Sequence, residues 1–276
     1  MIKEGALFFY NKDCIKEKSL TRPLRIMFMT SLRDIALEEH NGQLLNIKGV
    51  DCYVKGVIES TLESIQKGGT LEGLIEVAGV IIDDTLEDLK GKFPLLPTDD
   101  NSWIFPTELL SKDNIWNIPS LFRKLPKGDQ IGRKKAKYDF ELSVFQKIND
   151  VGADILILDS YMARIEYLFN LMPNRVINIH PGPTLMGHPF CFRGNTPYSD
   201  AILFAKNNGG PVYTGATLHF VNTNFDDGGF IAYICNTPVY EEEEWITLMY
   251  ENYISAKTPI FIMGLKHYVS KIFPYL

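Results

Sequence analysis

Three polar residues, Asn178, His180 and Asp226, have the types and spacing that acyl transfer needs. Asn178 and His180 stand in the stretch VINIHPGP, residues 176–183, where an apolar run is broken by two prolines and a glycine. An amide and an imidazole at the rim of a sheet can both donate hydrogen bonds to one carbonyl oxygen as it becomes an oxyanion. A nearby carboxylate would orient the imidazole and let it move a proton, and Asp226 in the acidic Gly-Gly turn at 226–229 is the candidate.

No Ser or Cys stands beside His180 in the pattern of a nucleophile elbow. The chemistry indicated is therefore direct acyl transfer, in which the attacking atom belongs to a second substrate. A structural interpretation stays open, because Asn and His can cap loop amides at a strand end. An Asp-Asp-Gly-Gly turn taken alone is, moreover, usually only a turn.

The elements that must position these residues follow from the hydrophobic pattern. Apolar runs predict strands at 24–30, 74–82, 154–162, 176–181, 214–222 and 230–240, and helices are predicted at 57–68, 138–152, 164–172 and 198–208. This alternation predicts a Rossmann-like open α/β sheet, mostly parallel with an antiparallel C-terminal part, and helices on both faces. Ligands bind beyond the carboxyl ends of strands in such sheets, which is where Asn178 and His180 lie.

The chain is predicted to divide into an N-terminal extension at 1–23, a catalytic domain at 24–240 and a C-terminal helical segment at 241–276. Two insertions are expected in the catalytic domain, at about 34–56 and 98–137. The second is rich in Asp, Pro and Lys, which predicts an irregular tract. One hypothesis is that it closes over the site as a lid, and the alternatives are a passive surface insertion or an oligomer contact.

Composition limits the partners. The 276 residues are 45% hydrophobic with a net charge of −6, so bulk electrostatics do not favour nucleic acid. The sequence contains no run of 18 apolar residues, so no membrane span is expected. The four cysteines are far apart with no C-x-x-C pair, and the five histidines show no metal-ligand spacing. We expect a cytoplasmic protein with no metal site.

Three segments in order resemble the folate-dependent formyltransferase family, which includes glycinamide ribonucleotide, methionyl-tRNA and nucleotide-sugar formyltransferases. They are SYMARIEYLFNLMPNRVINIHPGP, RGNTPYSDAI and GATLHFVNTNFDDGGFI, within residues of about 150–240. The family signature is Asn-x-His-Pro, then Arg-Gly-x-x-Pro, then a Thr-x-His-x-Val strand with an Asp-x-Gly turn. Here these are Asn178, His180, Pro181; Arg193, Gly194, Pro197; and Thr217, His219, Val221, Asp226, Gly228.

The resemblance implies 10-formyltetrahydrofolate as formyl donor. It also implies that Asn178 and His180 stabilise a tetrahedral intermediate while Asp226 assists proton transfer. Asp226 is chosen over Asp227 because it lies seven residues after His219 and begins the Asp-x-Gly turn. The folate-binding candidates are Tyr161, Met162, Ile177, Asp227 and Gly228. For Tyr161 and Met162, plain core packing is the alternative.

The glycine-rich phosphate loop of the glycinamide ribonucleotide enzymes is absent, because the corresponding stretch at 29–34 reads MTSLRD. Hydroxyl groups and a guanidinium could still hold a phosphate there, and an ordinary polar strand end is the alternative. The acceptor-binding candidates are Thr30, Ser31, Arg33, Arg193, Gly194 and Pro197.

The resemblance implies an N-formyltransferase that acts on the primary amine of a small phosphorylated acceptor, with glycinamide ribonucleotide as the leading candidate. An amino-sugar nucleotide acceptor and hydrolysis of formyl-folate are the alternatives. A folate- or nucleotide-binding regulator is a non-enzyme alternative, although a pure binder has no need of the three groups together. A homodimer is left open.

Overall fold

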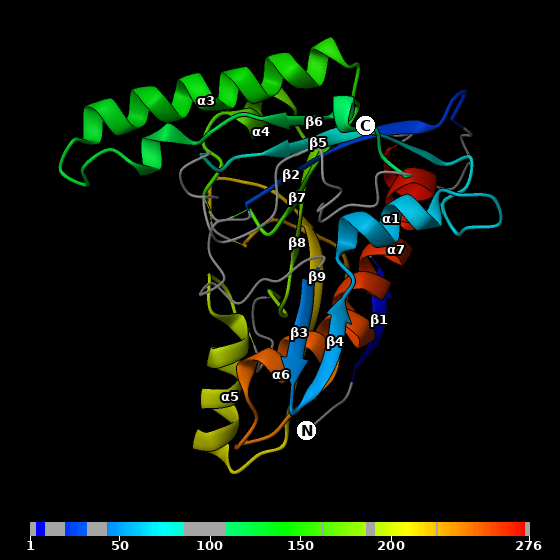
Figure 1. The fold of residues 1–276 in the computed structure, drawn as a ribbon, viewed down its shortest axis with the longest axis vertical. Coiled ribbons are helices and arrows are strands. Elements are labelled where there is room, and N and C mark those ends of the chain that lie inside the picture. The colour runs from blue at the N-terminus through cyan, green and yellow to red at the C-terminus, as the bar shows by residue number, and fades with distance from the viewer. Residues whose placement is uncertain are drawn as a thin grey trace.

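The computed structural model describes residues 4–8, 20–31, 43–85, 109–161, 163–185, 191–224 and 226–273. An eight-stranded sheet runs through it in the order β1-β10-β9-β8-β7-β2-β5-β6, with helices on both faces (Figure 1). Its strands are β1 (Glu4–Phe8), β2 (Leu24–Thr30), β5 (Ile75–Ile82), β6 (Ile115–Asn117), β7 (Ile155–Asp159), β8 (Val176–His180), β9 (Val212–Phe220) and β10 (Phe230–Val239). The predicted Rossmann-like α/β fold is confirmed.

The direction of pairing changes along this sheet. β2 pairs in parallel with both β5 and β7, and β7 pairs in parallel with β8. β8–β9, β9–β10 and β10–β1 are antiparallel, as predicted for the C-terminal part. The chain leaves β2 toward β5 and later returns to the other side of β2 as β7. The carboxyl ends of β2 and β7 therefore flank the topological switch point, where open α/β sheets bind ligands.

The central strand β2 is buried on both faces because helices cover both. Alternate residues point to opposite sides of a strand. Leu24, Ile26 and Phe28 join the cluster that includes α1 and the C-terminal helices. Met27 and Met29 join the cluster beneath α3 and α4. A strand buried in this way needs a continuous apolar run, which is why it was visible in the sequence.

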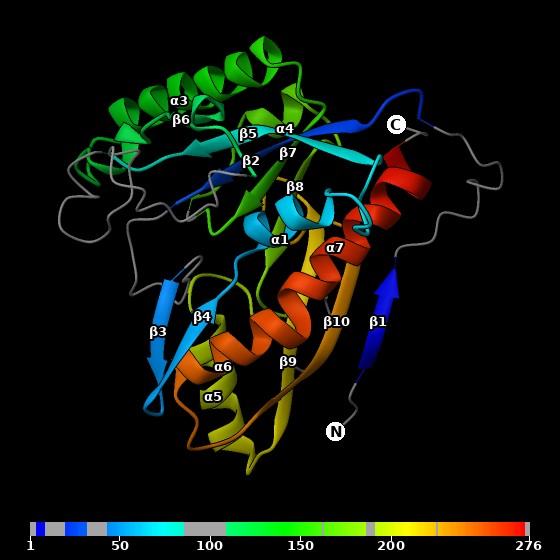
Figure 2. The ribbon, with the colours of Figure 1, turned by 45° about the vertical axis from the view of Figure 1, so that its right-hand side comes forward.

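The helices form two layers around the sheet. They are α1 (Val57–Ser64), α3 (Gln130–Asp150), α4 (Leu168–Leu171), α5 (Pro197–Asn208), α6 (Trp245–Asn252) and α7 (Thr258–His267), with π-helical turns at Tyr253–Lys257 and Tyr268–Ile272. Figure 2 shows the C-terminal helical run crossing β9 and β10, with α1 beside α7 and α3 on the far side of β2 and β5.

The N-terminal segment is part of the sheet. The extension predicted at 1–23 contributes β1, which is an edge strand of the sheet and pairs with β10. The insertion predicted at 34–56 contains a hairpin, β3 (Gln43–Ile47) and β4 (Val50–Val54). Its turn lies at Lys48 and Gly49, with φ of 51° and 83°, the left-handed values of a two-residue hairpin loop. The domain boundaries themselves stay a prediction.

The expectation of an irregular tract at 98–137 is wrong for its described part. That part contains β6, which pairs with β5, and helix α3 begins at Gln130. Asp129 caps the helix, since its Oδ1 accepts a hydrogen bond from the Gly132 amide at 2.9 Å. The Arg and Lys residues that follow are good helix formers. The helix was not predicted here because Gly132 and the run of charges hide any hydrophobic period. The lid hypothesis for 98–137 stays a prediction, and residues 98–108 of that tract lie outside the described residues.

Within the described residues, no helix combines the length and the hydropathy that a membrane crossing requires.

Candidate functional site

Asn178 and His180 share one face of β8, because they are two residues apart on the strand. The neighbouring strand β9 runs antiparallel and places His219 opposite Asn178, and Thr217 opposite His180. His180 and His219 are buried, at 4% and 2% exposure. The site is therefore built on paired strands and is held by the register of the sheet.

Asp226 joins these residues from the turn after β9. Its Oδ2 lies 3.5 Å from Nδ1 of His180, and its Oδ1 lies 3.3 Å from Nδ2 of Asn178. His219 approaches as well, with Nε2 at 3.6 Å from Asp226 Oδ1 and 3.1 Å from Asn178 Nδ2. The structure thus brings together the three residues that the sequence predicted as catalytic.

The backbone of Asp226 is held in an unusual conformation. Its φ is 48°, a left-handed value that is uncommon for residues other than glycine. The Gly194 amide donates a hydrogen bond to Asp226 Oδ2 at 3.0 Å, which joins the segment before α5 to this turn. The turn also needs Gly228, because a Cβ there would collide with the backbone of Phe220. Gly194 and Gly228 therefore shape the carboxylate's position.

The Asp226 side chain strongly favours its ionised, negatively charged form. Burial alone would raise its pKa, but the His180 charge, the contact with His219 and the Gly194 amide together hold the pKa well below its ordinary value. The side chain is 8% exposed, so water screens these interactions little. A permanent negative charge beside an imidazole suits proton transfer through His180.

Both ring nitrogens of His180 face oxygen acceptors. Nδ1 faces the Asp226 carboxylate, and Nε2 lies 2.6 Å from the backbone carbonyl of Phe192. The Phe192 carbonyl can only accept a hydrogen bond, so Nε2 of His180 is the donor in that contact. Gly182 permits the close approach of this loop, since a Cβ there would lie 2.8 Å from the Phe192 carbonyl oxygen. A substrate oxygen that takes the Nε2 bond would replace the Phe192 carbonyl.

Asp227 has a different environment from Asp226. It is more exposed and forms an ion pair with Arg193, with Nη1 at 2.8 Å from Oδ1. The ion-pair hydrogen bond from Arg193 lowers the Asp227 pKa. Arg193 also donates to the Thr184 carbonyl at 2.6 Å. Arg193, which was predicted to bind the acceptor, thus ties the 226–229 turn to the loop that follows β8.

A small cavity of about 50 Å³ adjoins the triad, and its wall is lined by Leu158, Tyr161, Ala163, Arg164, Asn178, His219, Val221, Asn224 and Asp226. Tyr161 both lines the cavity and packs in the core, with its ring stacked 6.5 Å from that of Phe140. Ile177 points into the core on the other side and is fully buried. Met162 lies outside the described residues. Ligand sites are usually 300–1,000 Å³, so the described residues enclose only part of a folate-sized site.

The acceptor candidates are spread along the crevice. Thr30 ends β2, Ser31 follows it, and both are buried. The Ser31 hydroxyl donates to Asp83 Oδ1 at 2.6 Å, and Asp83 in turn pairs with Arg123 at 3.0 Å. Ser31 is therefore already engaged with a carboxylate at the place where we expected a phosphate. Arg33 lies outside the described residues, and Pro197 is the first residue of α5, its usual helical position.

The sequence singled out His219 only as part of the family signature and not as a site residue, yet its contacts with Asn178 and Asp226 make it part of the site. The sequence alone does not show that His219 faces Asn178, because that contact depends on the register between β8 and β9. Across the described ranges, no cluster of three or more His, Cys, Asp or Glu side chains could hold a metal ion.

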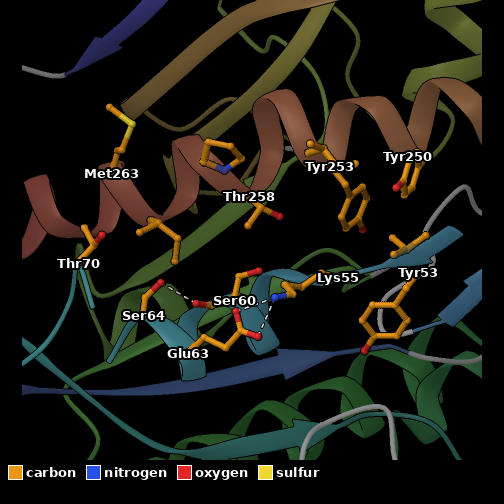
Figure 3. A pocket seen from close by; sticks show the side chains of 14 residues that line it. Tyr53, Lys55, Ser60, Glu63, Ser64, Thr70, Tyr250, Tyr253, Thr258 and Met263 are labelled. Atoms are coloured by element: carbon orange, nitrogen blue, oxygen red, sulfur yellow. Dashed lines mark hydrogen bonds and ion pairs between the residues drawn. The ribbon is translucent and has the colours of Figure 1, made fainter. Parts of the chain in front are cut away.

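A larger cleft, of about 400 Å³, lies away from the triad between α1 and the C-terminal helices. Tyr250 and Tyr253 project into it from the helical run, and Lys55 pairs with Glu63 at its other wall (Figure 3). None of the catalytic candidates lines this cleft.

The chain resembles several known proteins. A solved structure described as PvdF of pyoverdin biosynthesis, an N10-formyltetrahydrofolate-dependent formyltransferase, is 25% identical with a TM-score of 0.78. The match covers 90% of this chain and all of that one. Phosphoribosylglycinamide formyltransferase from Bacillus halodurans shares the fold at 20% identity and a TM-score of 0.55, over 90% of this chain and 96% of that one.

Two curated relatives match shorter segments. A formyltetrahydrofolate deformylase from Corynebacterium sp. (strain P-1) is 31% identical over 36% of this chain, and the chloroplastic phosphoribosylglycinamide formyltransferase of Arabidopsis thaliana is 34% identical over 29%. The matched segments span 32% and 26% of those two proteins. The family model described as formyl transferase matches residues 106–254, which include the whole triad, and the chain therefore belongs to the formyl transferase family.

Proposed function

We propose that this protein transfers the formyl group of 10-formyltetrahydrofolate to a primary amine of a small acceptor. The observation that carries the proposal is the convergence of Asn178 and His180 on Asp226, whose carboxylate lies 3.3 Å from Asn178 and 3.5 Å from His180. Family membership and the whole-chain likeness to a folate-dependent formyltransferase support it.

In the proposed reaction the acceptor amine attacks the formyl carbon. His180 and Asn178 donate hydrogen bonds to the formyl oxygen as it becomes an oxyanion. The C–N bond to the acceptor forms, and the bond between the formyl carbon and N10 of the folate breaks. The attacking nitrogen loses one proton and N10 gains one, so the reaction needs a group that moves a proton between them.

The Asp226–His180 pair is suited to that proton movement. Asp226 stays ionised and stabilises a positive charge on His180 at 3.5 Å. His180 can then give up and regain a proton while it faces the formyl group. The buried position of the pair keeps this exchange away from bulk water.

For folate we propose contacts with Tyr161, Met162, Asp227 and Gly228, beside the triad. The described lining suits a flat ring with polar edges, since Leu158 and Tyr161 line the small cavity together with the polar Asn178 and Asp226. Ile177 would contribute only through the core that supports β8.

For the acceptor we propose a small phosphorylated amine, with glycinamide ribonucleotide as the leading candidate because one curated relative carries that activity in its name. An amino-sugar nucleotide is the alternative. The Ser31–Asp83 contact disfavours a phosphate at that position, and Arg193 is already paired with Asp227, so Arg33 becomes the leading candidate to meet a phosphate.

Hydrolysis of formyl-folate is a second candidate function, because the other curated relative is a deformylase. The distinguishing experiment incubates the purified protein with 10-formyltetrahydrofolate, with and without each candidate amine. Transfer predicts folate turnover that depends on the amine and yields a formylated amine. Formate released at the same rate without any amine would instead support hydrolysis.

A further inference from the structure

One ion pair of the described residues is completely buried beside the switch point. Lys257 Nζ lies 3.0 Å from Asp159 Oδ1, and the two side chains are 0% and 1% exposed. Removing both charges from water is costly, and well-packed apolar residues often serve stability as well or better. A buried pair at this place therefore needs an explanation beyond holding the fold.

The lysine comes from an irregular part of the C-terminal helical run. It ends the π-helical turn Tyr253–Lys257, and such turns are frequent at functional sites. Its Nζ also donates to the hydroxyl of Tyr253 at 2.8 Å. Tyr253 in turn reaches from the helix toward β4 and Lys55 (Figure 3). Lys257 is thus fixed on its own helix before it meets the sheet.

The aspartate starts the loop that leads to the catalytic cavity. Asp159 is the last residue of β7, and Ser160 follows with a left-handed φ of 58°. The Ser160 carbonyl accepts a hydrogen bond from the Ser31 amide at 3.3 Å, which joins the ends of β7 and β2. The next residue, Tyr161, lines the cavity beside Asn178 and Asp226.

We propose that Lys257 is a positioning residue for the folate pocket. By holding Asp159 it fixes the left-handed turn at Ser160, and that turn presents Tyr161 to the cavity. A left-handed conformation is costly for a residue other than glycine and persists only where neighbouring contacts enforce it. This inference rests on the proposed function, because it assigns Tyr161 to a folate site.

The test compares three variants of the full-length protein with the wild type. Lys257→Met leaves the Asp159 carboxylate buried without its cation and should lower the melting temperature. Lys257→Met with Asp159→Asn removes both charges and keeps the size of each side chain. Arg22→Gln is the matched control, because Arg22 pairs with Asp154 at the opposite end of β7, at 2.7 Å.

Binding of 5-formyltetrahydrofolate is measured by calorimetry, and the melting temperature is measured on the same samples. Positioning predicts that the double variant melts close to the wild type but binds folate about tenfold more weakly, since small misplacements are costly to a site. The Arg22→Gln variant should bind like the wild type.

Wild-type affinity in the double variant would overturn the inference and leave the proposed function standing. An equal loss in Arg22→Gln would also overturn it, because any disturbance of β7 would then suffice. A wild-type protein that binds no folate would overturn the proposed function and this inference together.

Discussion

Replacing Asp226 with Asn removes one charge and almost no volume. The backbone at this position has a φ of 48°, and Asn is among the residues that adopt left-handed conformations most readily. The Asn carbonyl can still accept the hydrogen bond that the Gly194 amide gives Asp226 at 3.0 Å. The variant should therefore fold and keep the turn, so a change in rate reports the lost charge.

The size of the effect follows from the distance to His180. Two unit charges 3.5 Å apart attract by about 5 kcal/mol at an effective dielectric constant of about 20. Part of this attraction is offset because the Asn amide retains a dipole and water enters more readily. A loss of about 3–4 kcal/mol in transition-state stabilisation lowers kcat by two to three powers of ten, on the scale of about 1.4 kcal/mol for each power.

The assay is steady-state formyl transfer from 10-formyltetrahydrofolate, with thermal unfolding as the control for folding. Asp227→Asn is the matched comparison, because Asp227 is the adjacent carboxylate but pairs with Arg193 instead of His180. We expect that variant to raise the KM for folate and to leave kcat within a few-fold. If Asp226→Asn kept kcat within threefold of the wild type, or if both variants lost kcat equally, the assignment of Asp226 would be refuted.

Three further outcomes are expected. His180→Ala should lower kcat by about 10²–10³, the scale of one oxyanion donor, while circular dichroism stays native; near-full turnover would exclude His180 as a donor. Arg33→Ala should raise the KM for a phosphorylated acceptor at constant folate affinity, and an unchanged KM would place the phosphate elsewhere. Because folding lowers the Asp226 pKa, its stabilising effect is complete above about pH 3.9 and is lost as the pH falls through the folded pKa. The difference in melting temperature between the wild type and Asp226→Asn should thus be constant above about pH 4 and shrink from there toward pH 2, whereas an unchanged difference at pH 2 would contradict the ion pair.

The sequence was sufficient for the parts of the site that depend on strand ends. Asn178 and His180 stand where an apolar run stops, and parallel sheets bind ligands at that edge. The strand-end rule does not account for Asp226, because β9 runs antiparallel to β8 and ends opposite Ile177; Asp226 was found from its place in the family signature. Strands buried on both faces, such as β2 and β7, could also be predicted, because their sequences are continuous apolar runs.

Contacts that depend on distant pairing could not be read in the same way. His219 faces Asn178 only through the register of β8 with β9, and a one-residue slip would turn it to the other face. Lys257 meets Asp159 only after the C-terminal helices pack across the sheet. The start of α3 at Gln130 was missed because a capping Asp129 and a basic run have no hydrophobic period.

The central claim is that the triad passes a formyl group from folate to an amine. The most direct measurement is a single turnover with 10-formyltetrahydrofolate carrying ¹³C in the formyl group, a set of candidate amines, and mass spectrometry of every product. We predict that the label appears on the nitrogen of one amine with wild-type protein, and that Asp226→Asn slows its appearance by two to three powers of ten. Label recovered only as formate, or transfer that Asp226→Asn leaves unchanged, would contradict the claim.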